Sequence, residues 1–197
     1  MASLFDTLEV KAFRAGVPAR TDASRKWFRR KIKELGKVAP QKILKDDALH
    51  KVTRPLIGDM VTYFYDPKLK EELPYYDRFP LTIMVQPAKG GFHGLNLHYL
   101  APSVRALFLD ELMKLGPAKI SETTRIKKMR YKLLAGVNKY KEFKPCFKHY
   151  LMSHVDSNIM RVGMPEWEIA VFLPTQQFKK KSAQAVWAES RKIYKSV

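Results

Sequence analysis

Hydrophobic residues in the first part of the chain recur three and four positions apart, which is the spacing of an amphipathic helix. One stripe follows Ser3, a residue suited to cap a helix, and ends at Gly16. A second stripe predicts a helix from about residue 22 to residue 35, with Gly36 placed to end it. The apolar side of this second helix is expected to consist of Trp27, Phe28, Ile32 and Leu35. The pattern thus predicts two successive helices, followed by a loop with a short helix near residues 45–51.

The middle of the chain changes to β-branched and aromatic runs, which are typical of strands. Such runs occupy Met60–Tyr65, Leu81–Val85 and Phe92–Leu100, and the Gly90-Gly91 pair is a hairpin signal. The connection Asp66–Pro80 is long and holds three prolines. A loop of that length is usually functional or well packed. These runs predict a small, mostly antiparallel sheet.

Helical spacing returns after the predicted sheet. Helices are expected at residues 102–115, 121–134 and 181–194. Residues 167–173 form an apolar run that predicts one more strand in the sheet. The predicted fold class is therefore α+β, a small, mostly antiparallel β-sheet flanked by basic α-helices.

Charge divides the chain into three segments. The chain has 37 Lys and Arg against 19 Asp and Glu, a net charge of +18. Residues 1–57 carry +8 and residues 121–197 carry +10, whereas residues 58–120 are neutral. We interpret the first segment as a basic helical arm and the second as a β-rich core with a following helix. The third is interpreted as a basic helical part that forms one globular unit with the core. The excess indicates a polyanionic partner, because phosphates relieve the self-repulsion and release counterions on binding.

The second predicted helix is the strongest candidate for DNA contact, because dense cations on one helix suit the spacing of phosphates. Its candidate residues are Arg25, Lys26, Arg29, Arg30 and Lys33. Further candidates are Lys127, Lys128 and Arg130 in a later helical segment, and Lys179, Lys180 and Lys181 in a run beside Phe178. The alternative for the helix is a solvated face, and phosphate contact is favoured. For the lysine run, a frayed helix start is an equal alternative.

Two other groups of side chains allow different chemistry. Six aromatics either stack on bases or fill the core, and core packing is favoured because strand aromatics usually pack; they are Tyr63, Phe64, Tyr65, Tyr75, Tyr76 and Phe79. Four acids in the long connection offer ligands for Mg²⁺ in a nuclease; they are Asp66, Glu71, Glu72 and Asp77. No lysine follows a strand-borne acid in a nuclease-like pattern, so a nuclease is the least favoured function.

The sequence also excludes several classes of protein. Cys146 is the only cysteine, which rules out an internal disulfide and a cysteine zinc cluster and is typical of a reducing cytoplasm. No apolar run approaches the ~20 residues that span a bilayer. An anionic membrane is the other possible partner for the positive charge, but DNA is favoured and no membrane partner is expected. No phosphate-binding glycine loop, dinucleotide motif or serine hydrolase motif occurs. We expect no cofactor, no metal and no catalytic residue.

Several stretches together resemble a known family. They are Tyr63–Pro80, Gly91–Leu100, Phe143–Lys148 and Phe172–Pro174, and the start of the chain from Leu4 to Gly16 fits as well. Over nearly the whole chain the sequence resembles the DNA end protector proteins of T-even-like bacteriophages and their marine cyanophage relatives. The long tyrosine-rich stretch is the most specific part of this resemblance.

The resemblance implies a non-enzymatic phage protein that binds the ends of linear double-stranded DNA and shields them from host exonuclease. It also implies a place in the virion, late entry into the head near the portal or neck proteins, and action in the host cytoplasm. One alternative is a structural virion protein of the neck, head or baseplate whose basic surface meets packaged DNA or acidic subunits. The other is the Mg²⁺-dependent nuclease. Composition by itself supports DNA affinity and leaves end preference and oligomeric state open.

Overall fold

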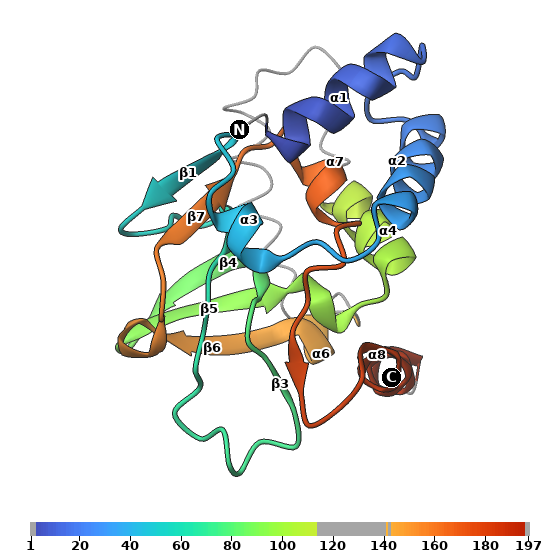
Figure 1. Cartoon of the computed structure of the whole chain (residues 1–197). Helices are drawn as coiled ribbons and strands as arrows, with labels where there is room; N and C mark the ends of the chain where they lie inside the picture. Colours follow the sequence, from blue (N-terminus) through green and yellow to red (C-terminus); the bar gives the residue numbers. More distant parts are fainter. Residues whose placement is uncertain (1–2, 114–140, 142, 196–197) are drawn as a thin grey trace.

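The computed structural model describes residues 3–113, 141 and 143–195 of the chain (Figure 1). Helices pack against a mostly antiparallel sheet, so the predicted α+β class is confirmed. The sheet is larger than the sequence predicted, because strands from the beginning and the end of the chain add to the central runs.

The two N-terminal helices form where the sequence signals placed them. Helix α1 spans Leu4–Arg14, and its N-cap Ser3 accepts a hydrogen bond from the backbone N–H of Asp6 at 3.1 Å. Helix α2 spans Asp22–Leu35 and begins with a capping box in which Thr21 and Ser24 bond each other's backbone. Gly36 ends α2 at φ +69°, in the left-handed region that glycine tolerates best. Local capping chemistry therefore fixes both helices.

The prediction of a short helix near residues 45–51 is wrong. A helix, α3, lies earlier at Pro40–Leu44, with proline in the first turn where no N–H is needed. Strand β1 follows at Leu49–Val52 and pairs antiparallel with a strand from the C-terminal part of the chain. The sequence of β1 has no strong local preference for a strand or a helix. It forms a strand because it pairs with a segment that is distant in the sequence.

Within the described residues, six strands form the main sheet in the order β1-β7-β2-β4-β5-β6. Beside β1, these strands are β2 Met60–Thr62, β4 Leu81–Ala88, β5 Gly91–Asn96, β6 Phe147–Leu151 and β7 Ile159–Val162. The β4–β5 hairpin turns at Gly90, which has φ +73°. The three predicted central runs thus became β2, β4 and β5. The last of them ends early, in the 3₁₀ turn Leu97–Tyr99.

The strand expected at residues 167–173 is also wrong. These residues form helix α7, Trp167–Ala170, and a following turn, in which the N–H of Val171 bonds the carbonyl of Trp167 at 3.1 Å. Every residue of the run except Glu168 is buried. A short, continuously apolar run fits a buried helix as well as a buried strand, so its pattern does not separate the two.

The remaining elements complete the fold around the sheet. They are helices α4 Pro102–Met113, α6 Phe143–Cys146 and α8 Ala183–Lys195, the 3₁₀ turn Met152–His154, and a two-stranded ladder of β3 Tyr76–Asp77 with β8 Phe178–Lys179. The ladder ties the long connection before β4 to the segment that leads into α8. Among the described residues, no helix has both the length and the apolar character needed to cross a bilayer.

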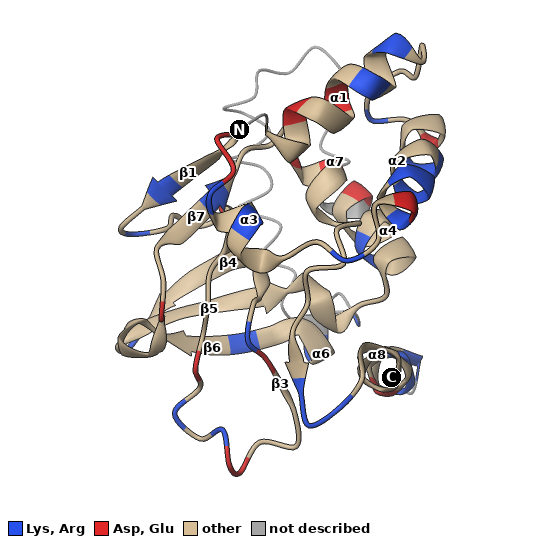
Figure 2. Ribbon diagram, in the orientation of Figure 1, with Lys and Arg blue, Asp and Glu red and all other residues tan. Residues whose placement is uncertain are grey.

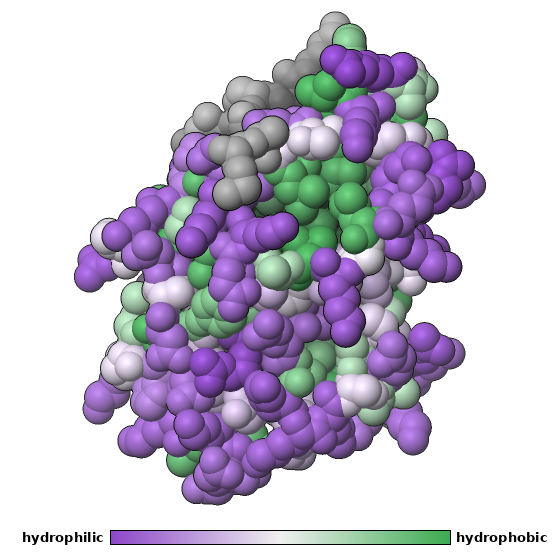
Figure 3. Space-filling model, in the orientation of Figure 1, coloured by the Kyte–Doolittle hydropathy of each residue, from purple (hydrophilic) through white to green (hydrophobic). Residues whose placement is uncertain are grey.

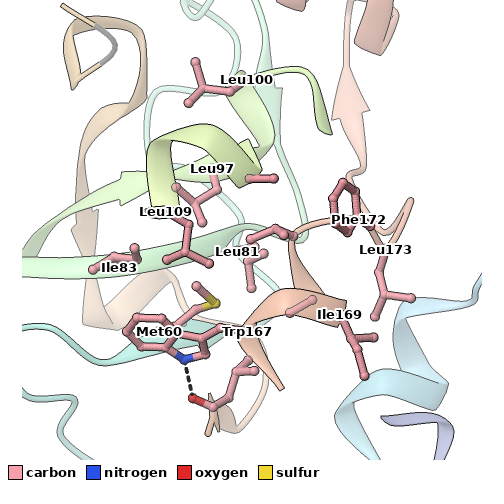
Figure 4. Packing of buried hydrophobic residues seen from close by; sticks show 14 of the residues in the cluster. Met60, Leu81, Ile83, Leu97, Leu100, Leu109, Trp167, Ile169, Phe172 and Leu173 are labelled. Atoms are coloured by element: carbon pink, nitrogen blue, oxygen red, sulfur yellow. Dashed lines mark hydrogen bonds between the residues drawn. The ribbon is translucent and has the colours of Figure 1, made fainter. Parts of the chain in front are cut away.

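The larger hydrophobic cluster joins the sheet to its helices. It contains Leu8 of α1, Phe28 of α2, Ile83 of β4 and Trp167 of α7, all buried. Trp167 also donates its indole N–H to the carbonyl of Val162 at 2.9 Å, which ties α7 to β7 (Figure 4). The core therefore holds the basic N-terminal helices against the sheet.

A second, mainly aromatic cluster belongs to the other face of the sheet. Met60 lies in the first cluster and its neighbour Val61 in the second, as the alternation of strand side chains requires. The ring centroids of Tyr63, Phe92 and Tyr150 lie 5.5–6.1 Å apart. These contacts are in the range of packed aromatic pairs.

Candidate nucleic-acid interface

Four cations of α2 point into solvent from one side of the helix. Lys26, Arg29, Arg30 and Lys33 are all exposed, and none is in an ion pair with another described residue. Their spacing of three, four and seven positions places them along roughly 10 Å of one helix face. Trp27, Phe28 and Ile32 of the same helix are buried. We call these four cations the α2 row. They face solvent because the apolar side of the amphipathic helix is buried against the rest of the protein.

Arg25 is placed differently from the other α2 candidates. Its guanidinium lies 2.8 Å from the carboxylate of Asp22 and 2.8 Å from that of Asp110 in α4. The Arg25 side chain is about a quarter exposed. The ion pair of Arg25 with Asp110 therefore links α2 to α4.

Further exposed cations lie on the elements and loops that come after α2. They follow α2 in the chain and are Lys37, Lys42, Lys45, Lys51 and Arg54. Figure 2 shows cationic segments on α2, on α3 and on β1 across one view of the molecule. We call these five residues and the α2 row together the cationic belt. Sequence reasoning missed the five because they are spread over two elements and the loops around them. Their common signal is an excess of basic over acidic residues throughout residues 1–57.

The three lysines at 179–181 differ from each other. Lys180 donates from Nζ to the carbonyls of Lys70, Glu71 and Leu73 at 2.7, 2.8 and 3.1 Å. Lys181 is paired with Glu189, and its Nζ lies 4.7 Å from the ring centroid of Tyr75. Lys179 is exposed and forms no ion pair with a described residue. The frayed helix start is wrong, because Lys179 ends a strand and α8 begins only at Ala183.

Lys127, Lys128 and Arg130 lie outside the described residues, as does the helix expected at residues 121–134. Their contact with DNA stays a prediction.

Asp77, one of the acids of the nuclease alternative, is fully buried in a polar network. Its carboxylate accepts hydrogen bonds from the backbone N–H groups of Phe79 and Gln177 at 3.1 and 2.8 Å, and it lies 2.7 Å from Nδ1 of His98. Burial opposes its charge, but His98 and the two backbone donors outweigh burial and lower the pKa of Asp77. Burial also lowers the pKa of His98, although Asp77 acts against this. The Asp77 carboxylate therefore organises the loop around it.

The other acids are also unsuited to a shared metal ion. Asp66 forms ion pairs with Lys70 at 2.9 Å and Arg78 at 3.2 Å, and its hydrogen bond with Lys70 lowers the pKa of the Asp66 carboxyl. Glu71 and Glu72 are exposed. Among the residues that the structure describes, no three His, Cys, Asp or Glu side chains are grouped to hold a metal.

The six candidate aromatics are mostly packed. Tyr63, Tyr65 and Phe79 are buried, which confirms the favoured interpretation for these three. Phe64, Tyr75 and Tyr76 are half-buried, and Tyr75 packs against Tyr99 and Phe178.

Fold and charge together define a class: an α+β protein with exposed cations, free of ion pairs with described residues, along α2, α3, β1 and the loops around them. Residues 3–195 match the family model described as Phage T4 terminal DNA protecting protein, and the chain belongs to this family. The resemblance found in the sequence is thereby confirmed. The name of the family describes the protection of DNA ends, which is a binding role. Neither a curated protein nor a solved structure matches the chain significantly.

Proposed function

We propose that this protein binds the ends of linear phage DNA and, by occupying them, keeps host exonuclease from loading. The α2 row carries this proposal: four exposed cations, free of ion pairs with described residues, lie within two helical turns. Phosphates are the ligands that such a row suits best, since each neutralised phosphate releases condensed counterions. Family membership supplies the DNA terminus as the target.

Protection by occupancy depends on slow release from the DNA more than on reading bases. Contacts to phosphates position a protein on duplex DNA without reading its sequence. The cationic belt offers only lysine and arginine, so affinity should fall steeply with salt. The logarithm of the binding constant should change with the logarithm of salt concentration at a slope near −0.9 for each phosphate that the protein neutralises.

The setting of this activity is also part of the proposal. The protein is carried in the virion with the genome, contacts portal or neck proteins there, and acts in the cytoplasm of the infected host. Pull-down of portal and neck proteins that persists after DNase treatment is the expected result. Loss of every partner with DNase would remove this part of the proposal.

An exonuclease-protection assay tests the function. Linear duplex DNA is digested with and without the protein over a range of salt concentrations, with circular DNA as competitor. We expect the linear DNA to survive at low salt, protection to fade as salt rises, and an excess of circular DNA to leave protection largely intact. Digestion at the unprotected rate in low salt would refute the proposal. Degradation of linear DNA by the protein and Mg²⁺ alone would assign a nuclease.

A further inference from the structure

A hollow interrupts the cationic belt where the end of α2 meets α1 and α3. It measures about 590 Å³. Its lining comes from the start of α1, the end of α2, α3 and the loops on either side of α3. Figure 3 shows hydrophobic surface between α1 and α2, framed by hydrophilic side chains. The volume lies within the ~300–1,000 Å³ typical of pockets that bind organic ligands.

The apolar part of this hollow is open to solvent at Leu35. The sequence placed Leu35 on the buried side of α2, yet it is 43% exposed. Leu4 and Val38 beside it are half-buried, and Ile43 is buried beneath. A large exposed aliphatic side chain grouped with others favours a ligand with an apolar surface.

The rim of the hollow favours an anionic ligand. Lys37, Lys42 and Lys45 are exposed there, and none forms an ion pair with a described residue. Of the two acids, Asp46 is already engaged by the backbone N–H groups of Leu4 and Ala48 at 2.7 and 3.1 Å. Asp47 is exposed and is the one carboxylate of the lining outside such bonds. The occupant therefore combines an apolar surface with negative charge around it.

The end of a DNA duplex has this combination, and its interior lacks it. Along the duplex, both faces of every base pair are stacked and only groove edges and phosphates reach a protein. At a terminus, one flat face of the last base pair is free, with the phosphates of both strands around it. Aliphatic side chains are known to contact such unstacked base faces.

We propose that the hollow caps the terminal base pair of the duplex, with Leu35, Val38 and Leu4 against its free face and Lys37, Lys42 and Lys45 on the adjacent phosphates. This inference rests on the proposed function and adds the structural basis for choosing an end. The α2 row then grips the backbone of the same duplex further from its terminus.

The test compares two DNA molecules with the same stem. One is a blunt-ended duplex, and the other is a dumbbell whose ends are closed by covalent loops. The quantity measured is the ratio of their binding constants for the full-length protein. Leu35→Ser and, independently, Val38→Ser are compared with Leu69→Ser, a matched control on the long connection. Leu69 is 53% exposed, close to the 43% of Leu35.

We expect wild-type protein and Leu69→Ser to prefer the blunt duplex. Leu35→Ser and Val38→Ser should lower that preference about tenfold, which corresponds to about 1.4 kcal/mol, with little change in affinity for the dumbbell. Circular dichroism and thermal melting identify a variant that fails to fold, and the other variant then gives the answer.

An unchanged preference for the blunt duplex in both folded variants would overturn the capping role and leave the proposed function standing. If the variants also had a lower oligomeric state in sedimentation, the hollow would be assigned to a second copy of the chain. Absence of any DNA binding by the wild-type protein would instead remove the proposed function itself.

Discussion

Two basic stretches of this chain look alike in sequence but are used differently in the structure. In α2, four of the five candidate cations point into solvent without a described ion partner. At residues 179–181, two of three lysines are engaged by the protein itself: Lys180 by three carbonyls and Lys181 by Glu189. Density of charge is therefore a poor guide to a binding surface. The informative property is whether the folded chain already supplies a partner for each cation.

Arg25 repeats this contrast within α2. It follows the same helix as the α2 row, but it lies on the side that meets α4 and is paired with Asp110. Position on the helix face, more than residue type, separates a structural cation from one that is available to a ligand.

The largest loss of folding stability is expected when the buried carboxylate of Asp77 is removed. Asp77→Ala should lower the free energy of unfolding by about 3 kcal/mol or more, because His98, Asn96 and two backbone N–H groups lose a buried acceptor. Urea denaturation measures the change. Glu72→Ala, an exposed acid of the same connection, serves as the control and should stay within about 0.5 kcal/mol. Equal stability of the two variants would contradict this account of the Asp77 network.

Removal of the α2 row should abolish most DNA affinity without unfolding the protein. Replacing Lys26, Arg29, Arg30 and Lys33 together by alanine should weaken duplex binding roughly a thousandfold near 0.1 M salt and flatten the salt slope by about 0.9 for each phosphate that is no longer neutralised. The control exchanges each lysine for arginine and each arginine for lysine, which preserves the charge and should preserve the slope. Fluorescence anisotropy titrations across salt concentrations measure both quantities. An unchanged slope in the alanine variant would place the DNA elsewhere on the molecule.

Lys180 should contribute to stability much more than to DNA binding. Lys180→Gly removes the three hydrogen bonds but tolerates the left-handed φ of +67°, and it should cost about 1–2 kcal/mol of unfolding free energy. Lys180→Ala keeps the backbone strain as well and should cost about 1 kcal/mol more. Thermal melting ranks the variants. A salt slope that falls as far as in the α2 row variant would show that the lysine run does contact DNA.

The smallest effect is expected for Arg25, the internal control on α2. Arg25→Ala removes a partly exposed ion pair between helices, so it should cost about 1 kcal/mol or less in stability and leave the salt slope of DNA binding unchanged. Chemical denaturation and anisotropy on the same preparation give both values. A flattened slope with unchanged stability would return Arg25 to the α2 row.

The parts of the fold that sequence predicted are those specified locally. Caps at Ser3 and Thr21 and the glycine at 36 define α1 and α2 without reference to the rest of the chain. Strands β1 and β7 were missed because each has only four residues and is stabilised by pairing with the other. The two strands are more than 100 positions apart in the chain, so no local sequence pattern indicates that they pair.

The candidate site was predictable to a similar extent. Helical spacing suffices to place the α2 row on an exposed face, because the buried stripe fixes the opposite one. The role of Lys180 was not predictable, since the carbonyl of Lys70 that it bonds lies 110 positions away in the chain. The hollow at Leu35 was missed for the same reason, as α1 and α3 form it together with the end of α2.

The place of β7 between β1 and β2 also has a consequence for synthesis of the protein. When only the N-terminal half of the chain has been synthesised, β1 and β2 lack the strand that lies between them in the sheet. Pairing between segments so far apart in the sequence is slow. A chain cut short before β7 by a premature stop codon should therefore fail to complete its sheet, even though every residue of the cationic belt has already been translated.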